Sequence, residues 1–496
     1  MARLRREIEP VQPAALGKFL PAWQGVGSAS GGIGRLAEVL AQLEGVALPA
    51  SALERDILPA RVRGYSARLL DELTAAGEIT WVGVGALGRD DGNVALYRPD
   101  RLALLLSASS VPGPTAEPTG GSPASGASNS RSVPAVEGAA QKSGNNPPTA
   151  VAGGTGAREA GTSSPSDWVG EAIRRHLADR GASFYREILA GVLRVAAQDG
   201  RKQPTERELL DALWDLVWTT QVTNDTFAPL RALRWPRTGK DRSAARPRLG
   251  ASGRMGPPEA AGRWSLVSEA VSVSIALAGR APSDTERRHA VASGLLDRLG
   301  VVTRDGVAAE GVAGGFGAVY PILRELEERG RVRRGYFVEG LGGAQFALAG
   351  AVDRLRAERT DPSGDRPAAS QALLLAATDP ANPYGASLPW PRFGDDDRRV
   401  LTRSAGAYVV LVDGEAALYL DRGGKSLQTL PVFSADHVAE AALRAVYGLV
   451  LDGRVRSLQI ERVDGVSTAE SAHRQRLADA GFRPGYRGMT ARLSVP

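Results

Sequence analysis

The chain has 496 residues, of which 43% are hydrophobic, with a formal net charge of +6 and no cysteine. It is too long for one hydrophobic core, and the usual domain size gives about three or four domains. The lack of cysteine excludes disulfides and thiolate metal sites. The basic N-terminus is followed by no apolar stretch like that of a signal peptide, and no apolar run is long enough to cross a membrane. We therefore expect a cytoplasmic protein.

The first predicted module covers residues 21–106 and follows a basic N-terminal segment, residues 1–20. Apolar side chains three or four positions apart predict three helices, at 33–43, 49–58 and 66–76. Two alternating stretches, 78–84 and 94–97, flank Asp-Gly and Gly-Asn pairs, which are typical of hairpin turns. The module therefore reads as three helices followed by a β-hairpin.

A linker and a second module follow. Residues 107–165 are mostly Ser, Gly, Pro, Ala and Thr, and we expect them to be disordered because they cannot bury enough apolar surface. The second module, residues 166–266, has three predicted helices, at 167–178, 184–197 and 205–218. Thr205 and Glu208 form a capping-box pattern at the start of the last helix. A basic insert at 236–261 interrupts its predicted hairpin.

The third module covers residues 283–352. Ser283 or Asp284 is expected to cap its first helix, residues 314–329 hold its third helix, and 331–338 pairs with 344–348. A linker at 353–370 leads to the last domain, residues 371–496. Its apolar stretches predict strands at 372–377, 407–412, 416–420 and 458–463, and helices at 435–451 and 468–480. This is a small α+β domain.

One pattern occurs three times. Leucines three positions apart are followed, four positions later, by Gly77 in the first module, Thr220 in the second and Gly330 in the third, and each is followed by a strand. A glycine at that position ends a helix in a left-handed cap. A helix that ends in this way and continues into a hairpin is typical of a winged helix, whose commonest partner is nucleic acid. The sequence thus predicts a multi-domain α+β protein with tandem winged-helix modules and an α+β C-terminal domain.

Three motifs resemble catalytic or phosphate-binding sequences but lack their context. Gly83, Gly85 and Gly88 match the dinucleotide fingerprint, yet a turn and a strand follow them instead of a helix. Gly424-Lys425-Ser426 resembles the end of a P-loop, but Tyr419 replaces the required leading glycine. Asp395 begins an isolated acidic turn. No residues of this chain are expected to bind ATP, another cofactor or a metal.

Arginines near the ends of the recurrent helices are the candidate DNA-binding residues. They would contact phosphates while the helix reads base edges. Glu325, Glu327 and Glu328 on the same predicted helix as some of them would repel a duplex, so a protein–protein role stays open. The candidates are Arg61, Arg63, Arg68, Arg231, Arg234, Arg324, Arg329, Arg331, Arg333 and Arg334.

Several longer strings resemble the C-terminal region of large helicase-related (Lhr) proteins. The most distinctive are FLPAWQGV at 19–26, LPARVRGYS at 58–66, ALWDLVW at 212–218 and ATDPANPYG at 377–385. Further matching strings lie at 69–73, 223–226, 262–266, 335–341 and 344–346. Together these strings extend along nearly the whole chain outside its predicted linkers.

The resemblance implies a superfamily 2, ATP-dependent, 3′-to-5′ DNA helicase that acts in DNA repair. It also implies a C-terminal region of tandem winged helices that drives oligomerisation. The RecA-like motor, which would bind ATP and Mg²⁺, has no counterpart in this sequence. We therefore expect a fragment, a split-gene product or a stand-alone paralogue, with DNA, a homo-oligomer and a separately encoded helicase core as expected partners and no membrane.

Two alternatives remain open. Tandem winged helices with an appended β-rich domain also form DNA glycosylases, which need a carboxylate beside a pocket for an extruded base. Asp464 and Asp479 are the carboxylates to test for that activity, although no motif selects them. A DNA-binding transcription regulator is the second alternative.

Overall fold

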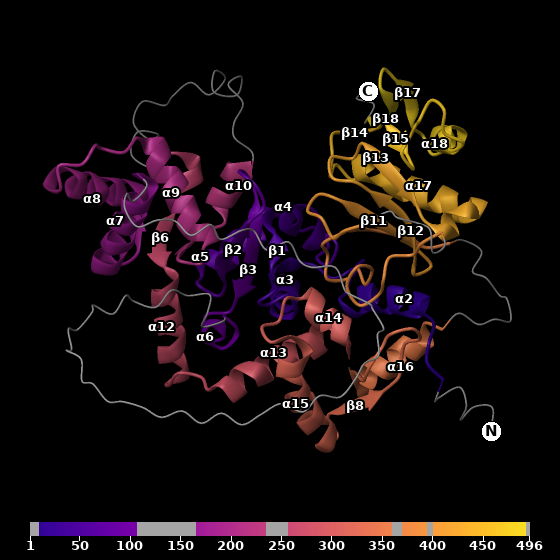
Figure 1. Ribbon diagram of the computed structural model, residues 1–496, viewed down its shortest axis with the longest axis horizontal. Coiled ribbons are helices and arrows are strands. Elements are labelled where there is room, and N and C mark those ends of the chain that lie inside the picture. The colour runs from indigo at the N-terminus through magenta and orange to yellow at the C-terminus, as the bar shows by residue number, and fades with distance from the viewer. Residues whose placement is uncertain (1–8, 107–164, 235–255, 360–369, 394–399, 493–496) are drawn as a thin grey trace, which may run out of the picture.

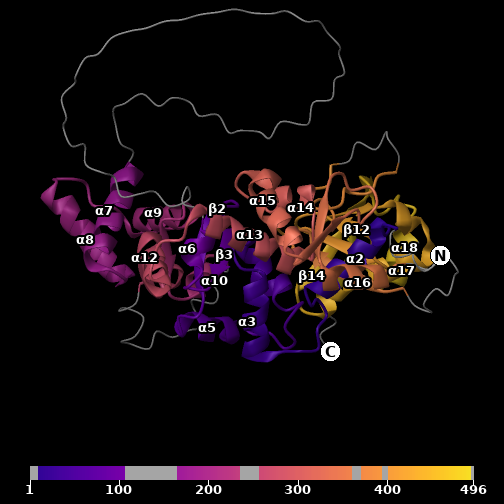
Figure 2. The ribbon, with the colours of Figure 1, turned by 90° about the horizontal axis from the view of Figure 1, so that it is seen from below.

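The computed structural model describes residues 9–106, 165–234, 256–359, 370–393 and 400–492. Figures 1 and 2 show the second module, in magenta, at one end and the C-terminal domain, in yellow, at the other. The first and third modules lie between them. In these ranges, no helix combines the length and the apolar character needed to span a membrane.

Three separate three-stranded sheets share one topology. Their strand orders are β1-β3-β2, β4-β6-β5 and β7-β9-β8, with antiparallel pairing throughout. In each sheet a short strand after the first helix pairs with the last strand of the hairpin that follows the third helix. This is the topology of a winged helix, and the predicted fold class is confirmed.

The recurrent pattern has one backbone conformation in all three modules. Gly77, Thr220 and Gly330 have φ angles of 71°, 64° and 68°. The left-handed region is rarely occupied by a β-branched residue such as threonine. Thr220 is held there by a hydrogen bond in which its hydroxyl donates to the carbonyl oxygen of Gly83, at 2.8 Å. The predicted left-handed helix end is therefore confirmed even where glycine is replaced.

The first module is built around α3, whose Leu36, Val39 and Leu40 are buried. Its elements are α3 (Gly32–Gln42), β1 (Leu48–Pro49), α4 (Ala50–Ala52), η1 (Leu53–Ile57), α5 (Ala67–Ala75), β2 (Thr80–Ala86), β3 (Gly92–Tyr97) and α6 (Leu102–Leu105).

The second module contains the predicted capping box. The Thr205 side chain accepts a hydrogen bond from the amide of Glu208, whose carboxylate accepts one from the amide of Thr205. Most of the predicted basic insert lies outside the described residues. The elements are α7 (Pro165–Arg180), β4 (Ser183–Phe184), α8 (Tyr185–Gln198), α9 (Glu206–Trp218), β5 (Val222–Asn224), α10 (Ala228–Arg234), η3 (Pro258–Ala260) and β6 (Arg263–Leu266).

The third module begins where Ser283 caps α13 by accepting a hydrogen bond from the amide of Glu286. Its elements are α13 (Asp284–Leu299), β7 (Val301–Val302), α14 (Arg304–Ala309), α15 (Gly315–Glu328), β8 (Val332–Gly335) and β9 (Gln345–Leu348). Two helices flank it, α12 (Val267–Ala278) and α16 (Ala349–Ala357). The sequence did not predict α12.

The N-terminal segment differs from the expectation. Residues predicted as part of a basic segment form α2 (Pro13–Trp23), which buries Leu16, Phe19 and Leu20 in the core of the third module. Trp23 also donates its indole hydrogen to the carbonyl oxygen of Asp297, at 2.8 Å. The helical spacing of these apolar residues was present in the sequence, but the basic composition before it concealed the pattern.

The C-terminal domain has a six-stranded sheet, β10-β11-β12-β13-β15-β16, and a three-stranded sheet, β14-β18-β17. The predicted second helix is short, because only Arg474–Asp479 (α18) is helical. The long helix is α17 (Asp436–Leu451). The strands are β10 (Ala372–Ala376), β11 (Tyr408–Val412), β12 (Glu415–Leu420), β13 (Ser426–Thr429), β14 (Ser457–Ile460), β15 (Arg462–Val463), β16 (Val466–Ser467), β17 (Arg483–Gly485) and β18 (Gly488–Arg492).

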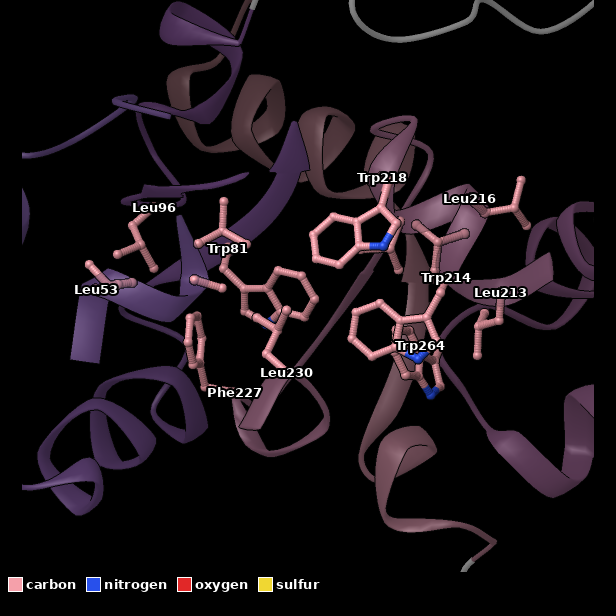
Figure 3. Packing of buried hydrophobic residues seen from close by; sticks show 14 of the residues in the cluster. Leu53, Trp81, Leu96, Leu213, Trp214, Leu216, Trp218, Phe227, Leu230 and Trp264 are labelled. Carbon is pink, nitrogen blue, oxygen red and sulfur yellow. The ribbon is translucent and has the colours of Figure 1, made fainter. Parts of the chain in front are cut away.

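The first and second modules share one hydrophobic core. Figure 3 shows Trp81 of β2 between the first-module leucines and Trp218 of α9. Trp81 contacts the Phe227 ring edge-on, with 5.9 Å between ring centroids. The Thr223 hydroxyl donates to the carbonyl oxygen of Trp81, and the Trp81 indole donates to that of Thr226, at 3.0 Å. These two modules are therefore one packing unit.

Candidate nucleic-acid interface and adjoining cavity

Three exposed arginines lie where the third module's α15 meets its wing. We call Arg331, Arg333 and Arg334 the wing cluster. Arg333 and Arg334 lie on β8, which is an edge strand of its sheet. Within the described ranges, no acidic side chain forms an ion pair with any of the three. The wing cluster therefore presents unneutralised positive charge to solvent.

The acidic residues of α15 are largely neutralised by arginines on the same helix. Arg324 pairs with Glu328 at 3.1 Å, and Arg329 pairs with Glu325 at 2.5 Å. Both are exposed pairs between residues four positions apart, which are commonly found on helix surfaces. The predicted repulsion of a duplex by Glu325 and Glu328 is thus weakened, while Arg324 and Arg329 are themselves engaged.

The solvent-facing side of α15 offers few free polar groups. Its exposed positions are Gly317, Pro321, Arg324, Glu325 and Glu328. Glycine and proline side chains cannot donate or accept hydrogen bonds, and the three charged side chains are in ion pairs. The sequence predicted that this helix reads base edges, but its exposed surface gives that prediction little support.

The structure contradicts the prediction that Arg61 contacts DNA. Its side chain has no exposed surface and forms an ion pair with Asp379, at 2.6 Å. It also donates to the side chain of Gln24 and to the carbonyl oxygen of Ile57. An arginine in this environment cannot reach a phosphate, and its role is to join the first module to the C-terminal domain.

The other sequence candidates lie in the first two modules. Arg231 donates to the carboxylates of both Glu54 and Asp71, so it also joins two modules and is not free for DNA. Arg63 and Arg68 are exposed at the start of α5. The side chain of Arg234 lies outside the described residues. Of the described candidates, Arg324, Arg329 and the wing cluster belong to one continuous stretch of chain, from α15 into β8.

A cavity of about 400 Å³ lies where three domains meet. Its walls come from α2, the segment around β1, β3, the α14 region, the loop after β10 and Arg403. Figure 1 shows α14 between the first module and the C-terminal domain. Because α14 directly precedes α15 in the chain, one module contributes both a wall of the cavity and the wing cluster.

The loop after β10 is fixed by its own hydrogen bonds. The buried amide of Asn382 donates to the carbonyl oxygens of Ala377 and Tyr384, at 3.0 and 3.2 Å, and its oxygen accepts from the amide of Tyr384, at 3.0 Å. Arg403 donates to the carbonyl oxygens of Asn382, at 2.5 Å, and Asp379, at 3.0 Å. The cavity therefore has a preformed wall.

The polar side chains that line this cavity include Asn93, Glu310 and Arg403, besides Thr378, Asn382 and Ser387 of the loop after β10. Asn93 is half-buried, and its amide has no hydrogen-bond partner among the described residues. Glu310 is held by the guanidinium of Arg298, with 2.8 Å between Arg298 Nε and Glu310 Oε1. Burial lowers the pKa of Arg403 to about 10, while the nearby Asp379 and Glu310 carboxylates oppose this shift, so Arg403 remains positive at neutral pH.

The two predicted glycosylase carboxylates lie elsewhere. Asp464 is in the turn between β15 and β16 with a φ of 51°, and its carboxylate accepts hydrogen bonds from the amide and hydroxyl of Thr429, at 2.8 and 2.7 Å. Asp479 is exposed at the end of α18 and accepts a hydrogen bond from Gln475. Neither of them lines this cavity, and each has a hydrogen-bond partner within the C-terminal domain.

The motif-like sequences have the structures expected of strands and turns. Gly83 and Gly85 lie in β2. Gly424 closes the turn between β12 and β13, where its amide donates to the carbonyl oxygen of Asp421, and the adjacent Lys425 pairs with Glu461. Asp395 lies outside the described residues.

Sequence reasoning missed Asn93, Glu310 and Arg403. Each is an ordinary polar residue in its local sequence, and nothing in the spacing brings the three together. One sequence feature did point to this region. The ATDPANPYG string at 377–385, which is part of the family resemblance, forms the loop that lines the cavity together with these three residues.

Comparison with known proteins gives two family matches. Models described as "Large helicase-related protein, winged-helix domain" match residues 11–99 and residues 281–367. These ranges contain all of the third module and the first module except α6. The first match begins at residue 11, so it also takes in α2.

Two curated relatives match most of the chain. "Lhr helicase/ probable uracil glycosylase" of Mycolicibacterium smegmatis is 39% identical over 486 residues, which are 95% of this chain and 27% of that protein. "Lhr helicase/uracil glycosylase" of Escherichia coli is 36% identical over 441 residues, which are 86% of this chain and 24% of that protein. The chain thus spans about a quarter of the length of these relatives.

Among solved structures, the Streptomyces sahachiroi DNA glycosylase AlkZ aligns with a TM-score of 0.43 at 14% identity. The alignment covers 87% of this chain and 97% of that one. A TM-score of this size does not establish a common fold.

Proposed function

The chain belongs to the large helicase-related family, being homologous to the C-terminal region of its members, and we propose that it is a non-motor, DNA-binding region of an ATP-dependent 3′-to-5′ repair helicase. The observation that carries this proposal is the wing cluster. Three exposed arginines that have no acidic partner among the described residues lie at a winged-helix wing, and arginine is well suited to phosphate oxygens.

The contacts are to phosphates rather than bases. The outward face of α15 has few free polar groups, whereas the wing cluster carries charge that is not neutralised within the described chain. Binding should therefore depend strongly on salt and little on DNA sequence.

The test replaces Arg331, Arg333 and Arg334 by alanine and measures DNA affinity across a salt series. The log–log slope should flatten by about 0.9 for each phosphate contact that is lost. The control replaces Arg324 and Arg329, which are already paired within α15, and should change the slope less. If the triple variant keeps the wild-type slope, the wing cluster does not contact DNA.

We also propose self-assembly, to which α12 lends support. Val273 and Leu277, one helical turn apart on α12, are 51% and 63% exposed. Adjacent exposed apolar side chains are a common feature of interfaces between subunits. Light scattering at micromolar concentration should detect an oligomer that dissociates when both are replaced by serine. If the triple arginine variant dissociates the oligomer instead, the wing cluster faces another protomer.

A second candidate function is DNA glycosylase activity. The printed names of both relatives include uracil glycosylase, and the cavity beside the wing-bearing module has the polar and apolar walls that such a site needs. The test is release of uracil from single-stranded DNA that contains one deoxyuridine. A preparation without contaminating glycosylase that releases no uracil would exclude this function.

A further inference from the structure

We propose that the cavity between the first module, the third module and the loop after β10 binds an extruded pyrimidine base, with Asn93 as the side chain that reads its edge. This inference rests on the glycosylase candidate and assigns its substrate site. It places that site in a different part of the chain from Asp464 and Asp479.

The volume of the cavity and the residues that line it fit a flat, partly apolar ligand. The cavity of about 400 Å³ falls within the range of roughly 300–1,000 Å³ that is usual for small-molecule sites. Leu20, Leu87 and Leu299 provide apolar surface. A base that has left the DNA stack needs apolar surface against its faces and hydrogen-bonding groups at its edge.

The side-chain amide of Asn93 is complementary to the hydrogen-bonding edge of a uracil base. A carboxamide places a hydrogen-bond donor beside an acceptor, and uracil places a carbonyl oxygen beside an N–H group, so the two can pair through two hydrogen bonds. Elsewhere in this region, the Asn382 amide is fully used within its own loop. Among the described residues, Asn93 has no such partner, so its amide is available to a ligand.

Glu310 is the carboxylate that lines this cavity, whereas Asp464 and Asp479 do not. Its side chain is mostly buried, at 14% exposure, and both of its oxygens accept from Arg298. Arg298 in turn donates to the carbonyl oxygen of Gln42, at 3.1 Å, which fixes the pair against the first module. A carboxylate fixed in this way can orient water or stabilise positive charge on the sugar.

The reaction at this site would be hydrolysis with water as the second reactant. The C1′–N1 bond breaks and its electron pair leaves with the base, while the water oxygen bonds to C1′. One water proton passes to Glu310 and then to solvent, and the base takes up a proton. The products are free uracil and an abasic sugar.

The test uses a matched pair of helix variants in the full chain. Ala308 and Ala309 of α14 are both exposed, but of the two only Ala309 lines the cavity. Ala309→Leu adds side-chain volume at the exposed rim of the cavity, and Ala308→Leu adds the same volume away from it. We expect saturation-transfer NMR with free uracil to show binding to the wild type and to Ala308→Leu, and to lose it in Ala309→Leu.

Two further variants separate binding from catalysis. Asn93→Ala should weaken uracil binding and uracil release together, because the edge contacts are lost in both. Glu310→Gln should bind free uracil as the wild type does but release it from DNA on the order of 10² times more slowly, as expected for loss of a general base. Thermal melting of each variant shows whether the fold is kept, and Glu310→Asp serves if the glutamine variant unfolds.

The possible failures can be told apart. If the wild type releases uracil from DNA and Ala309→Leu does so equally well, the cavity is not the base site although the glycosylase function stands. If the wild type releases no uracil, the proposed glycosylase function is wrong. The NMR comparison of the two alanine variants then still tests whether the cavity binds the base. Equal uracil signals from Ala308→Leu and Ala309→Leu, or no signal from the wild type, overturn the inference.

Discussion

The guanidinium of Arg61 and the carboxylate of Asp379 form a buried ion pair at 2.6 Å across 318 positions of sequence. The pair joins the first module to the loop after β10, and the side chains of both residues are at most 1% exposed. Asp379 also accepts a hydrogen bond from the amide of Ala381, at 2.8 Å. Because the loop forms a wall of the cavity, the ion pair fixes the position of that wall.

We expect Asp379→Asn to destabilise the protein strongly, because it leaves the Arg61 charge buried without a counter-charge. Removing one partner of a buried pair typically costs about 3–5 kcal/mol. Chemical denaturation followed by circular dichroism measures the change. Disruption of the exposed Arg324–Glu328 pair by Arg324→Ala is the control and should leave the midpoint nearly unchanged. A small effect of Asp379→Asn would show that the loop is held mainly by its other contacts.

The contact between the first two modules gives a second prediction. A Cβ atom on Gly92 would lie 2.5 Å from the ring of Trp218, so Gly92→Val should force the modules apart. Overpacking of this kind costs about 1–3 kcal/mol. Gly34 in α3 has open space around it, and Gly34→Ala should be neutral or slightly stabilising. Equal melting temperatures for the two variants would contradict the shared core.

The chain should hydrolyse no ATP, with or without DNA. Its P-loop-like triplet lies in a β-hairpin turn where Lys425 pairs with Glu461 at 3.1 Å, and phosphate binding by a P-loop needs the N-terminus of a helix. A coupled assay with single-stranded and duplex DNA measures this. Turnover that persists through purification and is abolished by Lys425→Ala would contradict the interpretation.

His473 should make the C-terminal domain acid-sensitive. Burial lowers the pKa of His473 below its ordinary 6.5, although Asp464, at 4.0 Å, opposes the shift. Below the unfolded-state pKa the unfolded chain therefore binds the proton more readily than the folded chain, so stability is present above about pH 6.5 and falls as the pH decreases.

The variant His473→Phe cannot titrate and should show a smaller loss of thermal stability between neutral and mildly acidic pH. The exposed His289 serves as the control position. If His473→Phe and the wild type lose stability in parallel over this range, the imidazole does not control the acid response.

The three main helices of each module and the winged-helix class could be predicted because they depend on local pattern, whereas α2 and α12 were missed. The capping residues Thr205 and Ser283, and the glycines after α5 and α15, act within a few positions of themselves, and each is found as predicted. The short strands β17 and β18 were missed, since a strand of three to five residues carries little periodic signal.

The candidate site was less predictable because burial depends on distant residues. Arg61 and Arg63 look alike in sequence, yet Asp379 lies against only the first of them. Likewise, Glu54 and Asp71 engage Arg231 from another module. The cavity is lined by residues between positions 20 and 405, and no local pattern brings such residues together.

The core shared by the first two modules means that the covalent connection through residues 107–164 is not what keeps them associated. With Trp81, Trp218 and Phe227 in a single hydrophobic cluster, a chain cut between positions 106 and 165 should behave as two complementing fragments. Co-expressed as separate polypeptides, the halves should purify together, so a gene break or a protease cut at this place would preserve the assembly.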